Sequence, residues 1–179
     1  MSNETSNNET SNNETSNNET GVVRLQGLED FIQHSVELIT PVLRQINILT
    51  PDFNADWLGA GEFVEQLKLC IVRNRRVKVR LLLVDPISGI RQNHPLIPLI
   101  KRLSRFEARV ITREFADKQP LKNAQLLVDL GGVLVRQSFS DYVGFVHYDD
   151  KHTVKNLLED YEQYWRFSTV HADLRHLYI

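Results

Sequence analysis

The segment Asn123-Ala-Gln-Leu-Leu-Val-Asp129, followed by Gly131-Gly-Val-Leu-Val-Arg-Gln-Ser-Phe-Ser140, decides the fold that we expect for this chain. Two short runs rich in leucine and valine flank the dipeptide Gly131-Gly132. Glycine adopts the positive φ angles that tight hairpin turns require, and aspartate is common beside them. The segment therefore predicts an antiparallel β-hairpin with Asp129 at its turn.

The residues around the hairpin alternate between helical and strand patterns. The strand pattern is clearest in Arg76-Val-Lys-Val-Arg-Leu-Leu-Leu-Val84, which alternates first and then becomes continuously apolar, as in a covered sheet. Elsewhere apolar residues recur at helical spacing. We expect helices at 27–44 (shortened by Pro41), 56–73, 93–103 (capped by Asn93) and 150–167, and strands at 46–50, 76–84, 107–113, 123–138 and 142–148.

This order of elements predicts the fold class. Strands separated by helices of 10–15 residues are typical of α/β proteins, in which helical crossovers connect parallel strands. A hairpin can only pair its two strands in antiparallel fashion. We therefore expect an α/β fold with a mixed sheet flanked by helices, in which the first strands are parallel and the later hairpin is antiparallel.

The hairpin resembles one half-site of the phospholipase D superfamily. That superfamily carries a His-x-Lys-x4-Asp motif on one strand and a Gly-Ser-x-Asn element on the next. Laid over this segment without a gap, the motif puts Asn123 at the histidine, Gln125 at the lysine and Leu130 at the aspartate, with Asp129 one residue early. Gln137-Ser-Phe-Ser140 replaces the second element. The resemblance implies a single phospholipase-D-like half whose catalytic side chains are missing.

The missing side chains argue against the reaction of that superfamily. Its histidine attacks phosphorus and forms a covalent intermediate, whereas the carboxamide of Asn123 is not nucleophilic. Its lysine offsets the charge on the phosphoryl oxygens, whereas Gln125 is uncharged. We therefore assign no catalytic residue and lean against an enzyme. Both amides can still donate hydrogen bonds to an anion, although they can equally be ordinary polar residues at the start of a strand.

The chain as a whole is similar to an uncharacterised bacterial family of such half-domains, some of which accompany acetyltransferase domains. Three pieces carry this resemblance: Val79-Arg-Leu-Leu-Leu-Val-Asp85, Asn93-His-Pro-Leu-Ile-Pro-Leu-Ile-Lys-Arg-Leu-Ser104, and Tyr164-Trp-Arg-Phe-Ser168 with Leu174-Arg-His-Leu177. The resemblance implies a fold and a bacterial source, but no reaction.

Composition defines the remaining expectations. Residues 1–20 form a pentapeptide repeat without an apolar residue after Met1, so we expect a disordered low-complexity segment before one domain at 21–179. The single cysteine, Cys70, excludes an intramolecular disulfide and favours a reducing compartment. No apolar run is long enough to span a membrane. We expect a cytoplasmic protein that uses no cofactor and no metal.

The net charge of −2 conceals an uneven distribution. Residues 73–113 contain eleven lysines and arginines against two acids. Because alternate strand residues share a face, Arg76, Lys78 and Arg80 lie on one side of the predicted strand. Such a surface would attract phosphate or nucleic acid. An ordinary solvated face is the alternative, since the pI is about 6.3 and the segment contains one aromatic residue, Phe106.

A second group of polar residues follows the carboxyl end of the predicted central strand, where ligands of α/β sheets gather. It consists of Asp85, Arg91 and His94, although Asp85-Pro86 and Asn93-His94-Pro95 are also typical of turns and helix starts. Asp85 and His94, together with Arg113, could form a relocated active site. The complete set of candidate anion-binding or ligand-binding residues is Arg76, Lys78, Arg80, Asp85, Arg91, His94, Arg113, Asn123 and Gln125.

Three functions are consistent with these observations. We favour a non-catalytic interaction or regulatory domain, which would bind a protein partner or a second copy, because active relatives bring two half-sites together. The alternatives are a protein that binds phosphate or nucleic acid through residues 73–113, and a phosphodiesterase or nuclease that uses Asp85, His94 and Arg113.

Overall fold

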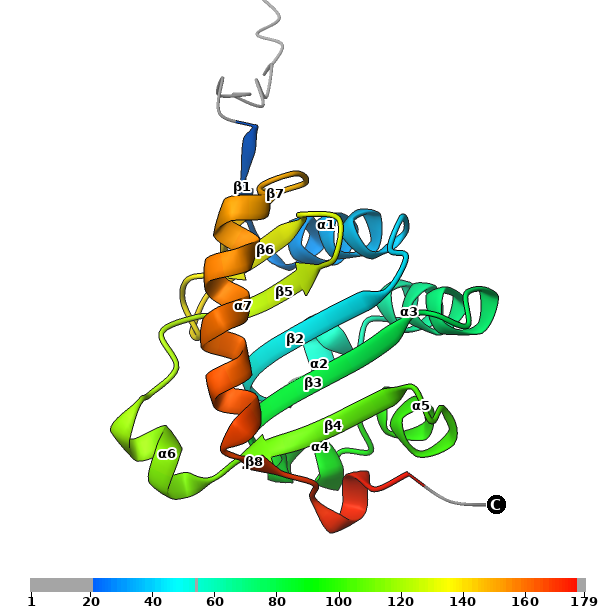
Figure 1. Ribbon diagram of the computed structural model, residues 1–179, viewed down its shortest axis with the longest axis vertical. Coiled ribbons are helices and arrows are strands. Elements are labelled where there is room, and N and C mark those ends of the chain that lie inside the picture. Colours follow the sequence, from blue (N-terminus) through cyan, green and yellow to red (C-terminus); the bar gives the residue numbers. More distant parts are fainter. Residues whose placement is uncertain (1–20, 54, 177–179) are drawn as a thin grey trace, which may run out of the picture.

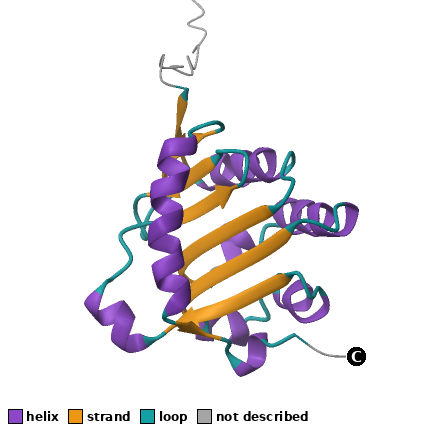
Figure 2. Cartoon of the chain, viewed as in Figure 1, coloured by secondary structure: helices purple, strands orange, loops and turns teal. Residues whose placement is uncertain are grey.

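All the strands belong to one mixed sheet, which two layers of helices enclose (Figures 1 and 2). The computed structural model describes residues 21–53 and 55–176, so the predicted segment 1–20 lies outside the described residues. The sheet has the strand order β1-β7-β6-β5-β2-β3-β4-β8. Its strands are β1 (Val22–Gln26), β2 (Gln45–Asp52), β3 (Lys78–Asp85), β4 (Phe106–Ile111), β5 (Ala124–Val128), β6 (Val133–Arg136), β7 (Val143–His147) and β8 (Ser168–Thr169).

The directions of the strands follow their connections. β2, β3 and β4 are parallel neighbours, because a helical crossover joins each to the next. β5 pairs with β2, β6 with β5, and β7 with β6, each in antiparallel fashion. The edge strands β1 and β8 are antiparallel to β7 and β4. The expected α/β fold with a mixed sheet flanked by helices is therefore confirmed, as are the parallel first strands and the antiparallel hairpin.

The first helical layer covers the face of the sheet that carries the main core. Val79, Leu81 and Leu83 of β3 point into this core, together with Ala124 and Leu126 of β5. Figure 1 shows the helices of this layer behind the sheet. They are α1 (Leu28–Ile39), α2 (Ala55–Leu58), α3 (Gly61–Arg73), α4 (Ile87–Arg91) and α5 (Ile97–Arg102).

The second layer consists of α7 (Lys151–Arg166), which crosses the front of the sheet, and the short α6 (Arg113–Lys118) (Figure 1). The side chain of Asp150 caps α7 by accepting a hydrogen bond from Thr153 N at 2.9 Å. Tyr161 of α7 is fully buried against Leu82 of the sheet, and Leu157 and Leu158 pack beside it. The strands β2 to β4 run out from under α7, so their amino-terminal halves have no described helix over this face (Figure 2).

The first helix ends at Ile39, just before Pro41, in agreement with the expected shortening by that proline. Other local expectations were wrong. Asn93 does not cap a helix: its φ is 53°, and α5 begins at Ile97. The helix expected at 56–73 is divided into α2 and α3. The strand expected to end at Arg113 ends at Ile111, because Arg113 begins α6.

The edge strands β1 and β8 were not expected, because five-residue and two-residue strands leave little periodicity in a sequence. The hairpin, by contrast, has the predicted turn. Gly131 has a φ of 91°, and a Cβ atom on it would lie 2.8 Å from Cγ of Lys151. The central hairpin therefore depends on a glycine at this position.

Candidate functional site

Asn123 and Gln125 lie at the start of β5, beside the carboxyl end of β2. Gln125 pairs with Leu49 on one side and Val135 on the other, and its side chain lies on the face that α7 covers. Its Nε2 donates a hydrogen bond of 2.6 Å to Oδ1 of Asn123. Gln125 is only 6% exposed, and its Oε1 has no hydrogen-bond partner among the described residues. The two amides therefore form a closed, uncharged pair.

The loop after β6 is held by its own side chains. Ser140 Oγ donates to Asp141 Oδ2 at 2.9 Å, and Ser138 Oγ lies 3.0 Å from Ser140 Oγ. The buried Arg136 donates to the carbonyl oxygens of Phe139 and Asp141 at 2.9 and 3.0 Å. Arg136 is thus a structural residue that ties the loop to the hairpin.

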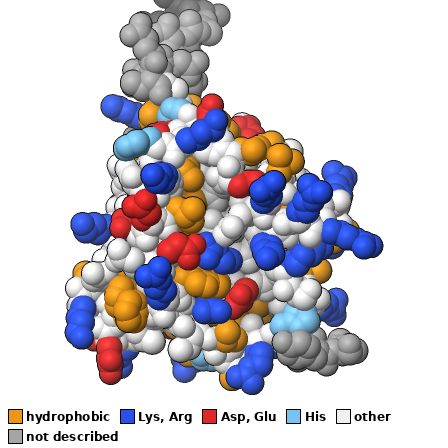
Figure 3. Space-filling view, in the orientation of Figure 1, with side chains coloured by type: hydrophobic (Ala, Val, Ile, Leu, Met, Phe, Trp, Pro, Cys, Tyr) orange, Lys and Arg blue, Asp and Glu red, His pale blue; other side chains and the backbone are white. Residues whose placement is uncertain are grey.

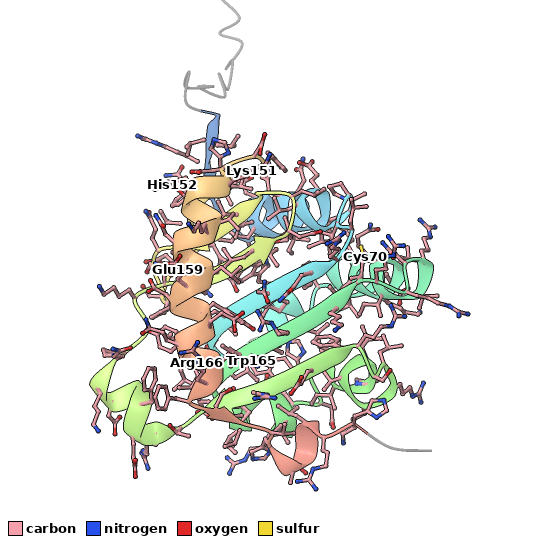
Figure 4. The ribbon with its side chains drawn as sticks, viewed as in Figure 1. Cys70, Lys151, His152, Glu159, Trp165 and Arg166 are labelled. Atoms are coloured by element: carbon pink, nitrogen blue, oxygen red, sulfur yellow. The ribbon has the colours of Figure 1, made fainter. Side chains whose placement is uncertain are left out.

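Arg80 has a structural role of the same kind on the opposite side of β5. Its guanidinium donates to Oε1 of Glu162 on α7 at 2.5 Å and to Oδ1 of Asn47 on β2 at 2.8 Å. It also lies 4.9 Å from the ring centre of Trp165, which Arg109 approaches to 4.4 Å. Figure 4 labels Trp165 near the end of α7. Arg80 therefore clamps α7 onto the sheet, and little of it is free for a ligand.

The arginines and lysines at the amino ends of β2 and β3 are, in contrast, exposed. We call the following five residues the basic edge: Arg44, Arg73, Arg75, Arg76 and Lys78. None of their side chains makes a hydrogen bond or an ion pair with another described residue. Figure 3 shows Lys and Arg side chains gathered on this part of the face, beyond α7.

Backbone contacts bring the basic edge together from two segments of the chain, residue 44 and residues 73–78. Lys78 N donates to Arg44 O at 2.8 Å, which places the starts of β2 and β3 side by side. Arg105 holds the end of α3 and the residue after it, donating to the carbonyl oxygens of Ile71 and Asn74 at 2.7 and 2.8 Å. Asp129 also lies at this edge, where its Oδ1 accepts from Leu43 N at 3.4 Å. Five positive charges therefore face one carboxylate at the amino end of the sheet.

Of these five residues, sequence reasoning identified Arg76 and Lys78. Arg73 and Arg75 lie in the same basic segment, so its charge was the available signal for them. Arg44 lies about thirty residues earlier in an acidic part of the chain. No local pattern indicates Arg44, because only the parallel pairing of β2 with β3 brings it to the basic edge.

The second candidate group is divided among different environments. Asp85 is exposed, and its Oδ1 accepts from Ile87 N at 2.8 Å, as in a turn that starts a helix. His94 is 0% exposed and stacks on Phe53, with ring centres 3.8 Å apart. Arg91 and Arg113 are exposed at α4 and α6. The imidazole of His94 is therefore closed to solvent, whereas the other three side chains are not.

Metal and membrane sites are not evident in the described part of the chain. Within 21–53 and 55–176, no three side chains of the His, Cys, Asp or Glu types group in a way that could hold a metal ion. No helix in these ranges has the length and apolar character to cross a membrane. Cys70 is buried, its Sγ lies 3.2 Å from Ile39 O, and burial raises the pKa of its thiol.

The fold is similar to that of several solved proteins at low sequence identity. An archaeal chromatin protein, TrmBL2, described as having a novel mode of DNA binding, superposes with a TM-score of 0.61 and 15% identity. The comparison covers 84% of this chain and 54% of TrmBL2, so the chain spans about half the length of that protein. At this identity the likeness establishes the fold alone.

Two bacterial proteins match over nearly their whole length. Nuc from Salmonella typhimurium, a phospholipase D family member, superposes with a TM-score of 0.58 and 13% identity, covering 84% of this chain and 98% of Nuc. NucT from Helicobacter pylori gives 0.58 and 12% identity over the same shares. The phospholipase-D-like fold expected from the hairpin is therefore confirmed. Among curated protein sequences none matches this chain. A family model matches residues 27–177, and the chain therefore belongs to the family described as Domain of unknown function (DUF7931).

Proposed function

We propose that this chain is a non-catalytic phospholipase-D-like domain that binds a phosphate-rich polyanion, nucleic acid being the class that fits best. The basic edge carries this proposal, because it holds five exposed positive side chains that have no partner among the described residues. Side chains that are already paired gain little from a ligand, whereas free guanidinium and ammonium groups can each neutralise a phosphate and release its counterions.

The residue types at β5 support the non-catalytic part of the proposal. Asn123 cannot attack phosphorus and Gln125 cannot supply positive charge. Gln125 is also only 6% exposed, so a substrate phosphate has little access to its side chain. These observations argue against hydrolysis at this end of the sheet.

The fold itself is compatible with nucleic-acid binding. TrmBL2, which has this fold, is described as a chromatin protein that binds DNA. That description concerns TrmBL2, and the argument for this chain is its own basic edge. Binding through the amino ends of β2 and β3 would use the end of the sheet opposite to the start of β5, where Asn123 lies.

A triple variant tests the proposal. Because Arg80 holds α7, its removal would disturb the fold, so the informative variant is R75A/R76A/K78A, which removes exposed and unpaired charges only. Binding to a fluorescent 20-nucleotide DNA would be measured across a range of salt concentrations. We expect at least tenfold weaker binding and a log–log salt slope smaller by about 2–3, since each phosphate contact contributes about 0.7–0.9.

The matched control is R24A/K151A/K155A, which removes the same charge from exposed positions on β1 and α7. We expect this variant to keep the salt slope of the wild-type protein. Equal weakening by both triple variants would show a response to net charge alone and would contradict a binding site at the basic edge.

A hydrolysis assay tests the non-catalytic part. We expect the wild-type protein to cleave neither the bound DNA nor bis(p-nitrophenyl) phosphate above the buffer rate. Cleavage that copurifies with the protein and disappears in the N123A/Q125A variant would contradict this part of the proposal.

A further inference from the structure

Three aromatic side chains form a stack at the carboxyl end of β4, and we call them the aromatic platform: Phe115, Tyr164 and Phe167. The rings of Phe115 and Phe167 are parallel within 11°, with centres 4.4 Å apart. Tyr164 packs its ring at 88° against Phe115, at 5.5 Å. Phe167 is 52% exposed, which makes it the most exposed aromatic side chain in the described part of the protein.

The backbone holds this platform in a fixed position. Thr112 N donates to Phe167 O at 2.8 Å, and the next residue, Ser168, pairs with Ile111 of β4. Ser168 Oγ donates to the carbonyl oxygen of Trp165 at 2.7 Å. Phe167 is therefore anchored between the end of α7 and β8, so its exposed ring needs no reordering to receive a ligand.

Exposed basic residues lie near the platform residues in the chain. Arg113 and Lys118 stand on either side of Phe115 in α6, and Arg166, which Figure 4 labels at the end of α7, directly precedes Phe167. With Lys122 they make four exposed bases, none of which has a side-chain partner among the described residues. Acids also lie in both elements, Glu114 and Asp117 in α6 and Glu159, Asp160 and Glu162 in α7, so the surface is mixed in charge. An exposed ring next to exposed guanidinium groups favours a ligand that carries both a flat ring and phosphates.

We infer that the aromatic platform binds an unpaired base of a single-stranded nucleic acid, which stacks on the outer face of Phe167 while Arg113 and Arg166 contact the adjacent phosphates. This inference rests on the proposed function and specifies its partner. Stacking accepts every base, because every base has a π face, so the expected binding is independent of sequence. A duplex offers no such base, since its bases are already stacked and paired.

The distance between the two surfaces fits one strand. The basic edge lies at the amino end of the parallel strands and the platform at the carboxyl end of β4, which has six residues. At about 3.3 Å per residue, β4 spans roughly 20 Å. At the spacing of one strand in B-form DNA, about 3.4 Å per nucleotide, about six nucleotides cover this length. A single strand of this size can therefore contact both surfaces of one protein molecule.

Three probes test the inference on the full chain: a 12-nucleotide oligothymidine, an abasic oligodeoxynucleotide of the same length, and a 12-base-pair duplex. The abasic probe retains the phosphates but lacks the bases. We expect the wild-type protein to bind oligothymidine more tightly than the abasic strand. F167A should weaken oligothymidine binding about 5- to 100-fold and leave abasic binding unchanged, since alanine removes the ring on which a base would stack but no positive charge.

Further variants separate stacking from packing. F167W should retain oligothymidine affinity, whereas F167L, which keeps an apolar side chain but has no π face, should behave as F167A does. The matched control is F139A, because Phe139 is also an exposed phenylalanine, at 43%, but lies in the loop after β6. We expect F139A to bind all three probes as the wild-type protein does.

The outcomes distinguish the inference from the proposed function. Equal affinity of the wild-type protein for oligothymidine and the abasic strand, or unchanged oligothymidine binding by F167A and F167L, would overturn the inference. If the inference failed in this way but the abasic strand still bound through the basic edge, the proposed function would stand. Binding of none of the three probes would overturn both.

Discussion

At the scale of single residues, a hydrogen-bonded cluster joins α1 to the residue after β7. The hydroxyl of Tyr148 donates to Oε2 of Glu37 at 2.6 Å and lies 2.6 Å from Nδ1 of His34. A tyrosine has one hydroxyl proton, so the second contact needs a proton on Nδ1 of His34. The hydrogen bond from Tyr148 is the main cause that lowers the pKa of Glu37 below its usual value.

This lowered pKa predicts a pH-dependent contribution to stability. A carboxyl group whose folded pKa is lowered stabilises the protein above its unfolded pKa, about 4.3, and the stabilisation disappears as pH falls through the folded value. Because Glu37 is partly exposed, the effect is small. We expect E37Q to lower the free energy of unfolding by less than about 1 kcal/mol at pH 7.

The difference between E37Q and the wild-type protein should vanish near pH 3, as measured by urea unfolding at both pH values. E159Q is the control, since Glu159 is exposed on α7 and has no side-chain partner among the described residues. A deficit of E37Q that persists unchanged at pH 3 would exclude a charged Glu37 as its origin.

At the scale of elements, β7 packs so closely against its neighbours that one position admits only glycine. Gly144 pairs with Leu25 of β1 and with Arg136 of β6. A Cβ atom at Gly144 would lie 1.9 Å from the carbonyl oxygen of Val135 and 3.0 Å from Cζ of Phe31. The backbone of β6 cannot move away without breaking its pairing with β5, so the clash cannot be relieved cheaply.

We therefore expect G144A to lower the free energy of unfolding by about 1–3 kcal/mol, the usual cost of overpacking. The measurement is the midpoint of urea unfolding followed by circular dichroism. G61A is the matched control, because nothing lies within 4 Å of a Cβ atom at Gly61, the first residue of α3. Alanine there should be neutral or stabilising by up to about 1 kcal/mol. Equal effects of the two substitutions would refute the close approach of β6 and β7.

The predicted elements agree with the structure where periodicity is strong. The alternation and apolar run of Arg76–Val84 indicated β3, and the apolar stripe from Val154 to Trp165 indicated α7. The predictions fail at short elements, where propensity competes with tertiary pairing. β1 forms because it pairs with the exposed edge of β7, and β8 because it pairs with the exposed edge of β4. No local pattern of residues indicates these long-range pairings.

At the scale of the whole molecule, both helical layers pack on the same sheet. The core under α1 to α5 and the smaller clusters under α6 and α7 are separated only by the thickness of the strands. β2 and β3 contribute side chains to both sides, through Ile48 and Leu81 on one face and Leu49 and Leu82 on the other. Unfolding of either layer should expose the same central strands.

We therefore expect a single cooperative unfolding transition. The two tryptophans report the two layers separately, because Trp57 is buried in the main core and Trp165 packs on the face that α7 covers. In W57F and in W165F, the fluorescence of the remaining tryptophan should follow the same urea curve as circular dichroism. Separate midpoints for fluorescence and circular dichroism within one variant would show that the layers unfold independently.

The sequence by itself determined the fold class, the hairpin and the uncharged side chains at its start, because these follow from periodicity, from glycine and from residue type. It also located the excess of positive charge in residues 73–113. Only the tertiary structure decided which charges are free: Arg80 is held by Glu162, whereas Arg44 joins Arg76 and Lys78 through the pairing of β2 with β3. It also brought Phe115 onto Phe167 across some fifty residues of chain. Pairing and stacking of this kind depend on long-range geometry, which no local pattern of residues encodes.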